Sequence, residues 1–131
     1  MDSTTIIYII DDDRDDQEFL IEAIKEIDLS IECYTAINGQ EGLTRLETGA
    51  VPFPSLVFLD LNMPRTDGRK FLTAIKKHAR FCSIPVVVYS TSDNDRDRYE
   101  VMELGATDYL VKQSDFALLK NNLATIILHA E

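Results

Sequence analysis

Five polar residues in this 131-residue chain follow or close short apolar runs, a placement that could bring them together for chemistry. The runs are rich in β-branched and aromatic residues, which is typical of strands buried on both faces. If such strands are parallel neighbours, their carboxyl ends meet at one edge of a sheet, where ligands usually bind. The five residues are Asp11, Asp12, Asp60, Ser90 and Lys112.

These residue types indicate a site for a divalent cation. Carboxylates held together raise one another's pKa values unless positive charge compensates them. Because the ligands on offer are oxygens, with no histidine or cysteine nearby, Mg²⁺ fits better than Zn²⁺. We expect Asp12 and Asp60 to ligate Mg²⁺ directly. Asp11 is expected to bind it through water, and Asn62 through its backbone carbonyl.

Asp60 is the candidate nucleophile, because a carboxylate can accept a phosphoryl group as an acyl phosphate. Phosphoryl transfer needs positioning and charge neutralisation more than covalent help. We expect Mg²⁺ and Lys112 to neutralise two phosphoryl oxygens and the Ser90 hydroxyl to bind a third. Attraction of Ser90 toward phosphorylated Asp60 would move the following loop and open space for Tyr109 to turn inward.

Alternating strand-like and helix-like periods must supply the frame. We expect strands over residues 6–10, 31–35, 56–60, 85–90 and 108–112. Helices are expected over 14–28 and 38–49, from 68, from 92 to near 105, and from 114. Their expected caps are Asp13, Asn38 in a capping box with Glu41, Ser92 and Ser114. Parallel strands joined by right-handed helical crossovers predict a doubly wound α/β sheet, whose strand order the periodicity does not give.

The bulk composition excludes several classes of function. A net charge of −10 argues against nucleic-acid binding, which relies on Lys and Arg. No apolar run is long enough to span a bilayer and no basic-flanked leader opens the chain, so we expect a cytoplasmic protein. We expect one domain over residues 1–131, with no output domain. Cys33 and Cys82 form no CxxC motif and are expected to be reduced thiols.

Four motifs resemble those of the receiver domains of two-component response regulators, over essentially the whole chain. They are Ile-Ile-Asp11-Asp12, Leu-Asp60-Leu-Asn-Met-Pro64 with Asp67-Gly68, Val-Val-Val-Tyr-Ser90, and Gly105-Ala-Thr-Asp-Tyr109-Leu-Val-Lys112. The resemblance implies a five-stranded, flavodoxin-like sheet of order 2-1-3-4-5 with five helices. It also implies phosphorylation by a sensor histidine kinase or histidine phosphotransfer protein, followed by self-catalysed dephosphorylation. Signalling to a downstream protein target would pass through the face of helix 4, strand 5 and helix 5.

Matched motif by motif, the resemblance assigns each residue a role: Asp11 and Asp12 form the acidic pair, Asp60 is the phosphoacceptor, Ser90 the hydroxyl, Tyr109 the switch aromatic and Lys112 the lysine. The residue sequences of two motifs, at 60–68 and 89–92, are most similar to those of stand-alone regulators, some of which serve phytochrome-type kinases. No other enzymatic activity is expected, and apolar positions of the last helix could support a homodimer.

One residue departs from the family pattern. Receiver domains usually have a proline after the lysine, joined by a cis peptide bond, whereas this chain has Gln113. A cis bond before a non-proline residue costs about 3–4 kcal/mol, so we expect a trans bond. A trans bond would reshape the loop and puts the reach of Lys112 into the site in question.

Three other functions share parts of this pattern. A phosphohydrolase of the haloacid-dehalogenase type also uses an Asp nucleophile with Mg²⁺, but it needs a second Asp where this chain has Asn62. A flavin-binding module needs Gly, Ser or Thr donors after the first strand, where residues 11–13 would repel a phosphate. A degenerate receiver acting as an unphosphorylated protein-binding module is supported by Gln113 alone.

Overall fold

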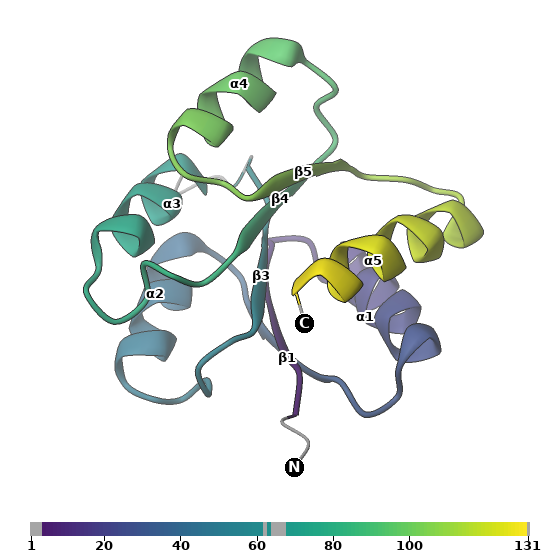
Figure 1. Cartoon of the computed structure of the whole chain (residues 1–131), viewed down its shortest axis with the longest axis horizontal. Helices are drawn as coiled ribbons and strands as arrows, with labels where there is room; N and C mark the ends of the chain where they lie inside the picture. Colours follow the sequence, from purple (N-terminus) through teal and green to yellow (C-terminus); the bar gives the residue numbers. More distant parts are fainter. Residues whose placement is uncertain (1–3, 62, 64–67, 131) are drawn as a thin grey trace.

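The computed structural model describes residues 4–61, 63 and 68–130, which form five strands and five helices in alternation (Figure 1). The strands are β1 (Ile6–Ile10), β2 (Glu32–Ala36), β3 (Leu56–Leu59), β4 (Val86–Ser90) and β5 (Asp108–Val111). The helices are α1 (Arg14–Ile27), α2 (Gly39–Glu47), α3 (Gly68–Lys77), α4 (Asp95–Glu103) and α5 (Phe116–Ala130). The expected elements are all present, with ends that differ by a few residues.

All strand pairs are parallel, in the order β2-β1-β3-β4-β5, so the expected fold class and strand order are confirmed. β1 and β3 are central neighbours, and Ile10 pairs with Leu59 at their carboxyl ends. The residues that follow these two strands are therefore adjacent at the rim of the sheet. β4 continues the sheet beside β3, and β5 forms one edge.

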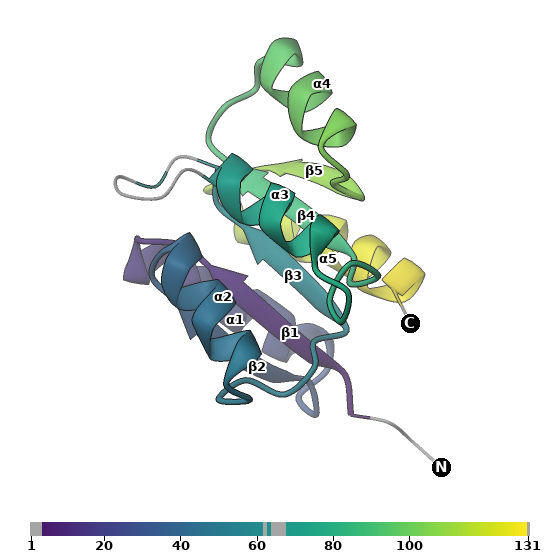
Figure 2. The ribbon, with the colours of Figure 1, turned by 90° about the vertical axis from the view of Figure 1, so that its left-hand side faces the viewer.

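The helices cover both faces of the sheet (Figures 1 and 2). α1 and α5 lie together on one face, where they enclose Ile7, Ile9 and Phe58. α2 and α3 lie on the other face, over Tyr8 and Ile10. This division follows from the strand geometry, because successive side chains point to opposite faces and both faces of a parallel sheet are buried.

Two helices begin at the caps expected from the sequence. The Asp13 carboxylate accepts hydrogen bonds from two first-turn amides of α1. The Asn38 side chain accepts from the amide of Glu41 at 2.8 Å. The carboxylate of Glu41 accepts from the amide of Ile37 rather than Asn38, so the capping box is shifted by one residue.

The expected caps of the last two helices were wrong. Asn94, not Ser92, caps α4, because its side chain accepts from first-turn amides while the Ser92 hydroxyl bonds elsewhere. Asp115, not Ser114, precedes α5 and accepts from the amide of Leu118 at 3.1 Å. In each case two candidate caps stand close together in the sequence, and the backbone selects the one nearer the helix.

Two further expectations concern the chain as a whole. Among the described residues, no helix is both long and apolar enough to cross a bilayer. Cys33 is half-buried and Cys82 exposed, and neither forms a disulfide, as expected for reduced thiols.

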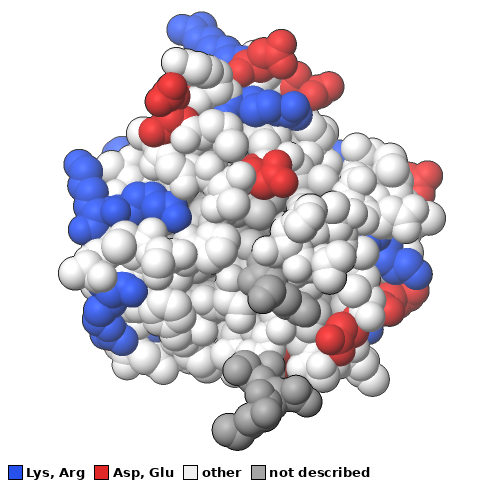
Figure 3. Space-filling model, viewed as in Figure 1, with Lys and Arg blue, Asp and Glu red and all other residues white. Residues whose placement is uncertain are grey.

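The face seen in Figure 3 carries acidic and basic side chains close together over α4.

Candidate functional site

Three carboxylates meet where β1 and β3 end. Asp11 and Asp12 follow β1, and Asp60 follows β3. One oxygen from each side chain lies within 4.8 Å of the others, which is close enough for all three to share one cation. Asp11 and Asp60 are 1% and 6% exposed, whereas Asp12 is exposed. The pairing of the two strands thus produces the acidic cluster that the sequence predicts.

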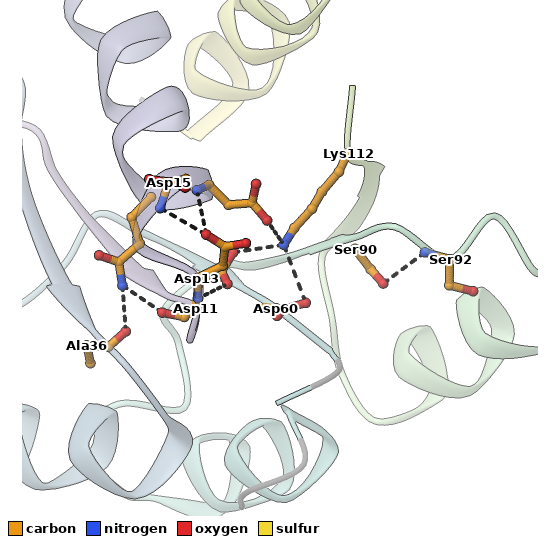
Figure 4. A network of polar contacts seen from close by, with 10 residues as sticks. Asp11, Asp13, Asp15, Ala36, Asp60, Ser90, Ser92 and Lys112 are labelled. Atoms are coloured by element: carbon orange, nitrogen blue, oxygen red, sulfur yellow. Dashed lines mark hydrogen bonds and ion pairs between the residues drawn. The ribbon is translucent and has the colours of Figure 1, made fainter. Parts of the chain in front are cut away.

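Lys112 brings the positive charge to this cluster from the end of β5 (Figure 4). Its Nζ lies 2.9 Å from Asp11 Oδ2 and 3.8 Å from Asp60 Oδ1. The bond to Gln113 is trans, as expected, because no cis peptide occurs in the described parts of the chain. Lys112 therefore reaches the site even without the proline of the family pattern.

The charges in the site are not balanced by Lys112 alone. Burial raises the pKa of Asp11 above its ordinary value, although the Asp13 amide and the Lys112 ammonium both lower it. Burial also lowers the pKa of Lys112, but hydrogen bonds to Asp16 and Asp11 outweigh this effect and the net pKa is raised. Lys112 is the one ammonium paired with this cluster in the described parts of the chain, and it faces two buried carboxylates and Asp16.

Asp16 belongs to the site, although the sequence analysis did not identify it as a site residue. Its Oδ2 lies 2.8 Å from Lys112 Nζ, slightly closer than the oxygen of Asp11. The sequence signal pointed to another role, because acids in the first turn of a helix are favoured by the helix dipole. Only the packing of α1 against the rim brings Asp16 to Lys112.

Gln17 is a second residue that sequence reasoning missed. It is buried, and its amide donates to the backbone carbonyls of Asp11 at 2.6 Å and Ala36 at 3.1 Å. These bonds fasten the backbone that carries the acidic pair to the neighbouring end of β2. A signal was available, because residue 17 precedes Leu20 and Ile24 on the inward face of α1, an unusual place for a polar residue.

Ser90 and Tyr109 both contact the loop after β4. Ser90 is fully buried, and its hydroxyl accepts a hydrogen bond from the Ser92 amide at 3.1 Å. Figure 4 shows this hydroxyl directed toward Ser92, away from Asp60. The Tyr109 hydroxyl donates to the Ser92 carbonyl at 2.9 Å, and the Arg98 guanidinium lies 5.0 Å from the centre of the Tyr109 ring.

The remaining predicted ligand, the backbone carbonyl of Asn62, lies outside the described residues. Beside the site is a hollow of about 420 Å³ between α1 and the loop after β5. Its lining includes Asp16, Phe19, Lys112 and Gln113. The hollow reaches Lys112, whose Nζ lies 2.9 Å from Asp11 Oδ2.

This fold and this constellation of acids, hydroxyl and lysine define a receiver domain. The model of the response regulator receiver domain matches residues 7–124, so the chain belongs to this family.

Comparison with individual proteins supports the same assignment. The chain is 32% identical over 111 residues to response regulator Rcp1 of Synechocystis, covering 82% of this chain and 76% of Rcp1. It is 29% identical over 110 residues to the sensor histidine kinase CheAY of Helicobacter pylori, covering 84% of this chain but only 13% of that kinase.

Two crystal structures of other response regulators superpose closely on the structure of this chain. The phosphorylated cyanobacterial phytochrome response regulator RcpA has a TM-score of 0.86 and 30% identity, over 95% of this chain and 91% of RcpA. The Mn²⁺-bound form of Rcp1 has a TM-score of 0.82 and 30% identity, over 93% of this chain and 91% of Rcp1.

Proposed function

We propose that this receiver is a phosphorylation-controlled switch in two-component signal transduction, with Asp60 as the phosphoacceptor. The observation that carries the proposal is the buried Asp60 carboxylate, flanked by Asp11, Asp12 and the Lys112 ammonium. The phosphodonor would be a sensor histidine kinase or a histidine phosphotransfer protein. In support, RcpA has been crystallised in a phosphorylated form.

The acidic cluster fits a divalent cation, and we propose Mg²⁺. All three donors are carboxylate oxygens within 4.8 Å of one another, a donor set that suits a hard cation. Asp11 and Asp60 are both buried, and the single Lys112 ammonium is shared between them and Asp16. When bound, the cation would neutralise charge on the phosphoryl oxygens. The Mn²⁺-bound form of Rcp1 agrees with a divalent-metal site.

The protein groups have separate tasks in this scheme. An Asp60 oxygen attacks phosphorus, the bond from phosphorus to the imidazole nitrogen of the donor breaks, and the imidazole keeps the electron pair. Lys112, which lies 3.8 Å from Asp60 Oδ1, offsets the charge that arrives with the phosphoryl group. Ser90 supplies a hydroxyl donor at the adjacent strand end. Water later attacks phosphorus, the bond from phosphorus to the Asp60 oxygen breaks, and inorganic phosphate leaves as the carboxylate is restored. We propose no reaction on any other substrate.

We further propose that phosphorylation changes the face formed by α4, β5 and α5, where a downstream protein target would bind. Tyr109 lies on β5, and its hydroxyl bonds the loop that follows Ser90. Apolar side chains are exposed on the two helices of this face, Tyr99 and Met102 on α4 and Leu118 on α5. A second copy of the chain could use this face, and the cytoplasmic location expected from the sequence is part of the proposal.

The degenerate-receiver alternative has lost its main support. It rested on Gln113 alone, yet Lys112, the residue before Gln113, makes two hydrogen bonds in the site. Both acids of the pair and the phosphoacceptor also lie together.

The decisive experiment is incubation with acetyl phosphate, a small phosphodonor, followed by intact-mass and peptide mass spectrometry. We expect one added phosphoryl group, mapped to Asp60, that appears with Mg²⁺ and disappears with a chelator. Asp60→Asn should abolish the label. Asp15→Asn is the matched control, because Asp15 is an exposed acid in the first turn of α1. A label on another residue, or one that persists in Asp60→Asn, would contradict the proposal.

A further inference from the structure

Ser92, in the loop between β4 and α4, is held through three of its groups. Its amide donates to the Ser90 hydroxyl at 3.1 Å, and its carbonyl accepts from the Tyr109 hydroxyl at 2.9 Å. Its own hydroxyl donates to Asp97 Oδ2 at 2.7 Å. The two residues expected to move during switching, Ser90 and Tyr109, therefore both bind the same loop residue.

Asp97 connects this loop to α3. It lies in the first turn of α4, and its other oxygen, Oδ1, accepts from Arg69 at 3.0 Å. Arg69 is the second residue of α3 and also forms an ion pair with Glu100, farther along α4. Because α3 packs into the core through Phe71 and its neighbours, Arg69 is a firm anchor. The Ser92–Asp97–Arg69 chain, which we call the loop clamp, thus ties the β4–α4 loop to the core.

The loop clamp affects how Ser90 can move. The Ser90 hydroxyl is directed toward Ser92 and away from Asp60 (Figure 4). To bind a phosphoryl group on Asp60, the hydroxyl must either turn away from the Ser92 amide or carry the loop with it. Turning away leaves a partly buried amide without its acceptor, which is costly. Carrying the loop would pull Ser92 away from Asp97, which Arg69 holds toward α3.

We propose that Asp97, anchored by Arg69, is a positioning residue that opposes the capture of Ser90 by a phosphorylated Asp60. The inference rests on the proposed function of Asp60 as phosphoacceptor. Asp97 acts through Ser92 and does not touch the reacting atoms. Moving Ser92 with Ser90 would stretch its bond to Asp97, so removing the Asp97 side chain would shift the population toward the moved loop. The loop clamp therefore sets how readily this receiver switches.

The test is calorimetric titration with beryllofluoride, which mimics a phosphoryl group on a carboxylate, at saturating Mg²⁺. We expect Asp97→Ala to bind it about three- to tenfold more tightly than the unaltered protein, the range set by one hydrogen bond. Ser92→Ala should do the same, and the double variant should gain no more than either alone. Asp95→Ala is the control, because it removes an exposed acid from the same turn and should leave the affinity unchanged.

A second measurement separates this inference from the proposed function. Hydrogen exchange of the Ser92 amide, followed without beryllofluoride, should be about three- to tenfold faster in Asp97→Ala and unchanged in Asp95→Ala. If the unaltered protein binds no beryllofluoride, the proposed function fails, and exchange alone decides on the loop clamp. Unchanged exchange overturns the loop clamp, as does unchanged or weaker beryllofluoride binding in both Asp97→Ala and Ser92→Ala. A merely structural role for Asp97 would not tighten binding.

Discussion

Lys112 Nζ lies 2.8 Å from Asp16 Oδ2, whereas the nearest oxygen of Asp60 is 3.8 Å away. One ammonium group therefore serves carboxylates from the ends of β1 and β3 and from the first turn of α1. A phosphoryl group on Asp60 would compete with Asp16 for this charge. The position of α1 against the rim is thus linked to the charge state of the site.

Replacing Lys112 by Met should destabilise the protein by about 1–3 kcal/mol at pH 7, because partly buried carboxylates lose their counter-charge. The loss should shrink as the pH falls toward 4. Lys112 lowers the pKa of Asp11, so its loss raises that pKa further, and protonation of the carboxyl at lower pH relieves the uncompensated charge. Urea unfolding between pH 4 and pH 7 measures the effect. Lys120→Met, which removes a more exposed ion pair with Glu26, should cost less than about 1 kcal/mol.

Replacing Gln17 by Met should lower the free energy of unfolding by about 1–2 kcal/mol, because the backbone carbonyl of Asp11 loses a buried donor. It should also weaken Mg²⁺ binding, since the backbone that carries Asp11 and Asp12 loses its fastening to β2. Chemical unfolding and Mg²⁺ titration measure the two effects. The exposed neighbour Glu18 provides the control, and Glu18→Met should change stability by no more than about 0.5 kcal/mol.

Two glycine-to-alanine variants should differ sharply in how much stability they lose. A Cβ at Gly68 would lie 2.5 Å from the carbonyl oxygen of Asp60 and 3.0 Å from the Cα of Leu61, so backbone must move. We expect Gly68→Ala to cost about 3 kcal/mol and to slow phosphorylation of Asp60. A Cβ at Gly42 would meet the tip of the Ile10 side chain at 2.8 Å, which can shift. Gly42→Ala should change stability by about 1 kcal/mol or less, and equal costs would contradict the argument.

The buried hydroxyl of Tyr89 should make the protein sensitive to alkali. Burial raises the pKa of Tyr89 from its ordinary value of 10.0 to about 12, although Lys112 lowers it. Above pH 10 the unfolded chain loses this proton while the folded protein keeps it, so stability falls between pH 10 and pH 12. A difference of about two units between the folded and unfolded pKa values corresponds to roughly 2–3 kcal/mol of stability. Tyr89→Phe should reduce the fall by that amount in denaturant titrations, and an identical pH profile would refute the assignment.

The sequence was sufficient to predict the elements of the fold. Short, β-branched apolar runs such as residues 6–10 favour buried strands, and the helical period between them indicates crossovers. The strand order came from the resemblance, because periodicity carries no information about which strands are neighbours. Polar residues at strand ends, such as Asp60, were identifiable because charge is otherwise rare in those runs.

What the sequence did not reveal depends on packing between distant segments. Asp16 pairs with Lys112, which is 96 positions away, and nothing local in α1 marks it for that contact. Ser92 and Asn94 are both good caps, and the choice between them depends on how the loop after β4 is held. Asp97 looks like an ordinary first-turn acid, and its bond to Arg69 exists only because α3 and α4 are neighbours.

The fourth helix is attached to the body of the molecule more weakly than its neighbours. Of its nine residues, all within the described part of the chain, only Val101 is buried. Burying one valine is worth about 2 kcal/mol, which leaves much of the attachment to polar contacts such as that of Arg69. These ion pairs are partly exposed, so they hold the helix less firmly than a wide buried apolar face would. Tilting this helix would therefore cost the contacts of one buried valine and a few polar groups, while the buried contacts of the sheet stay intact.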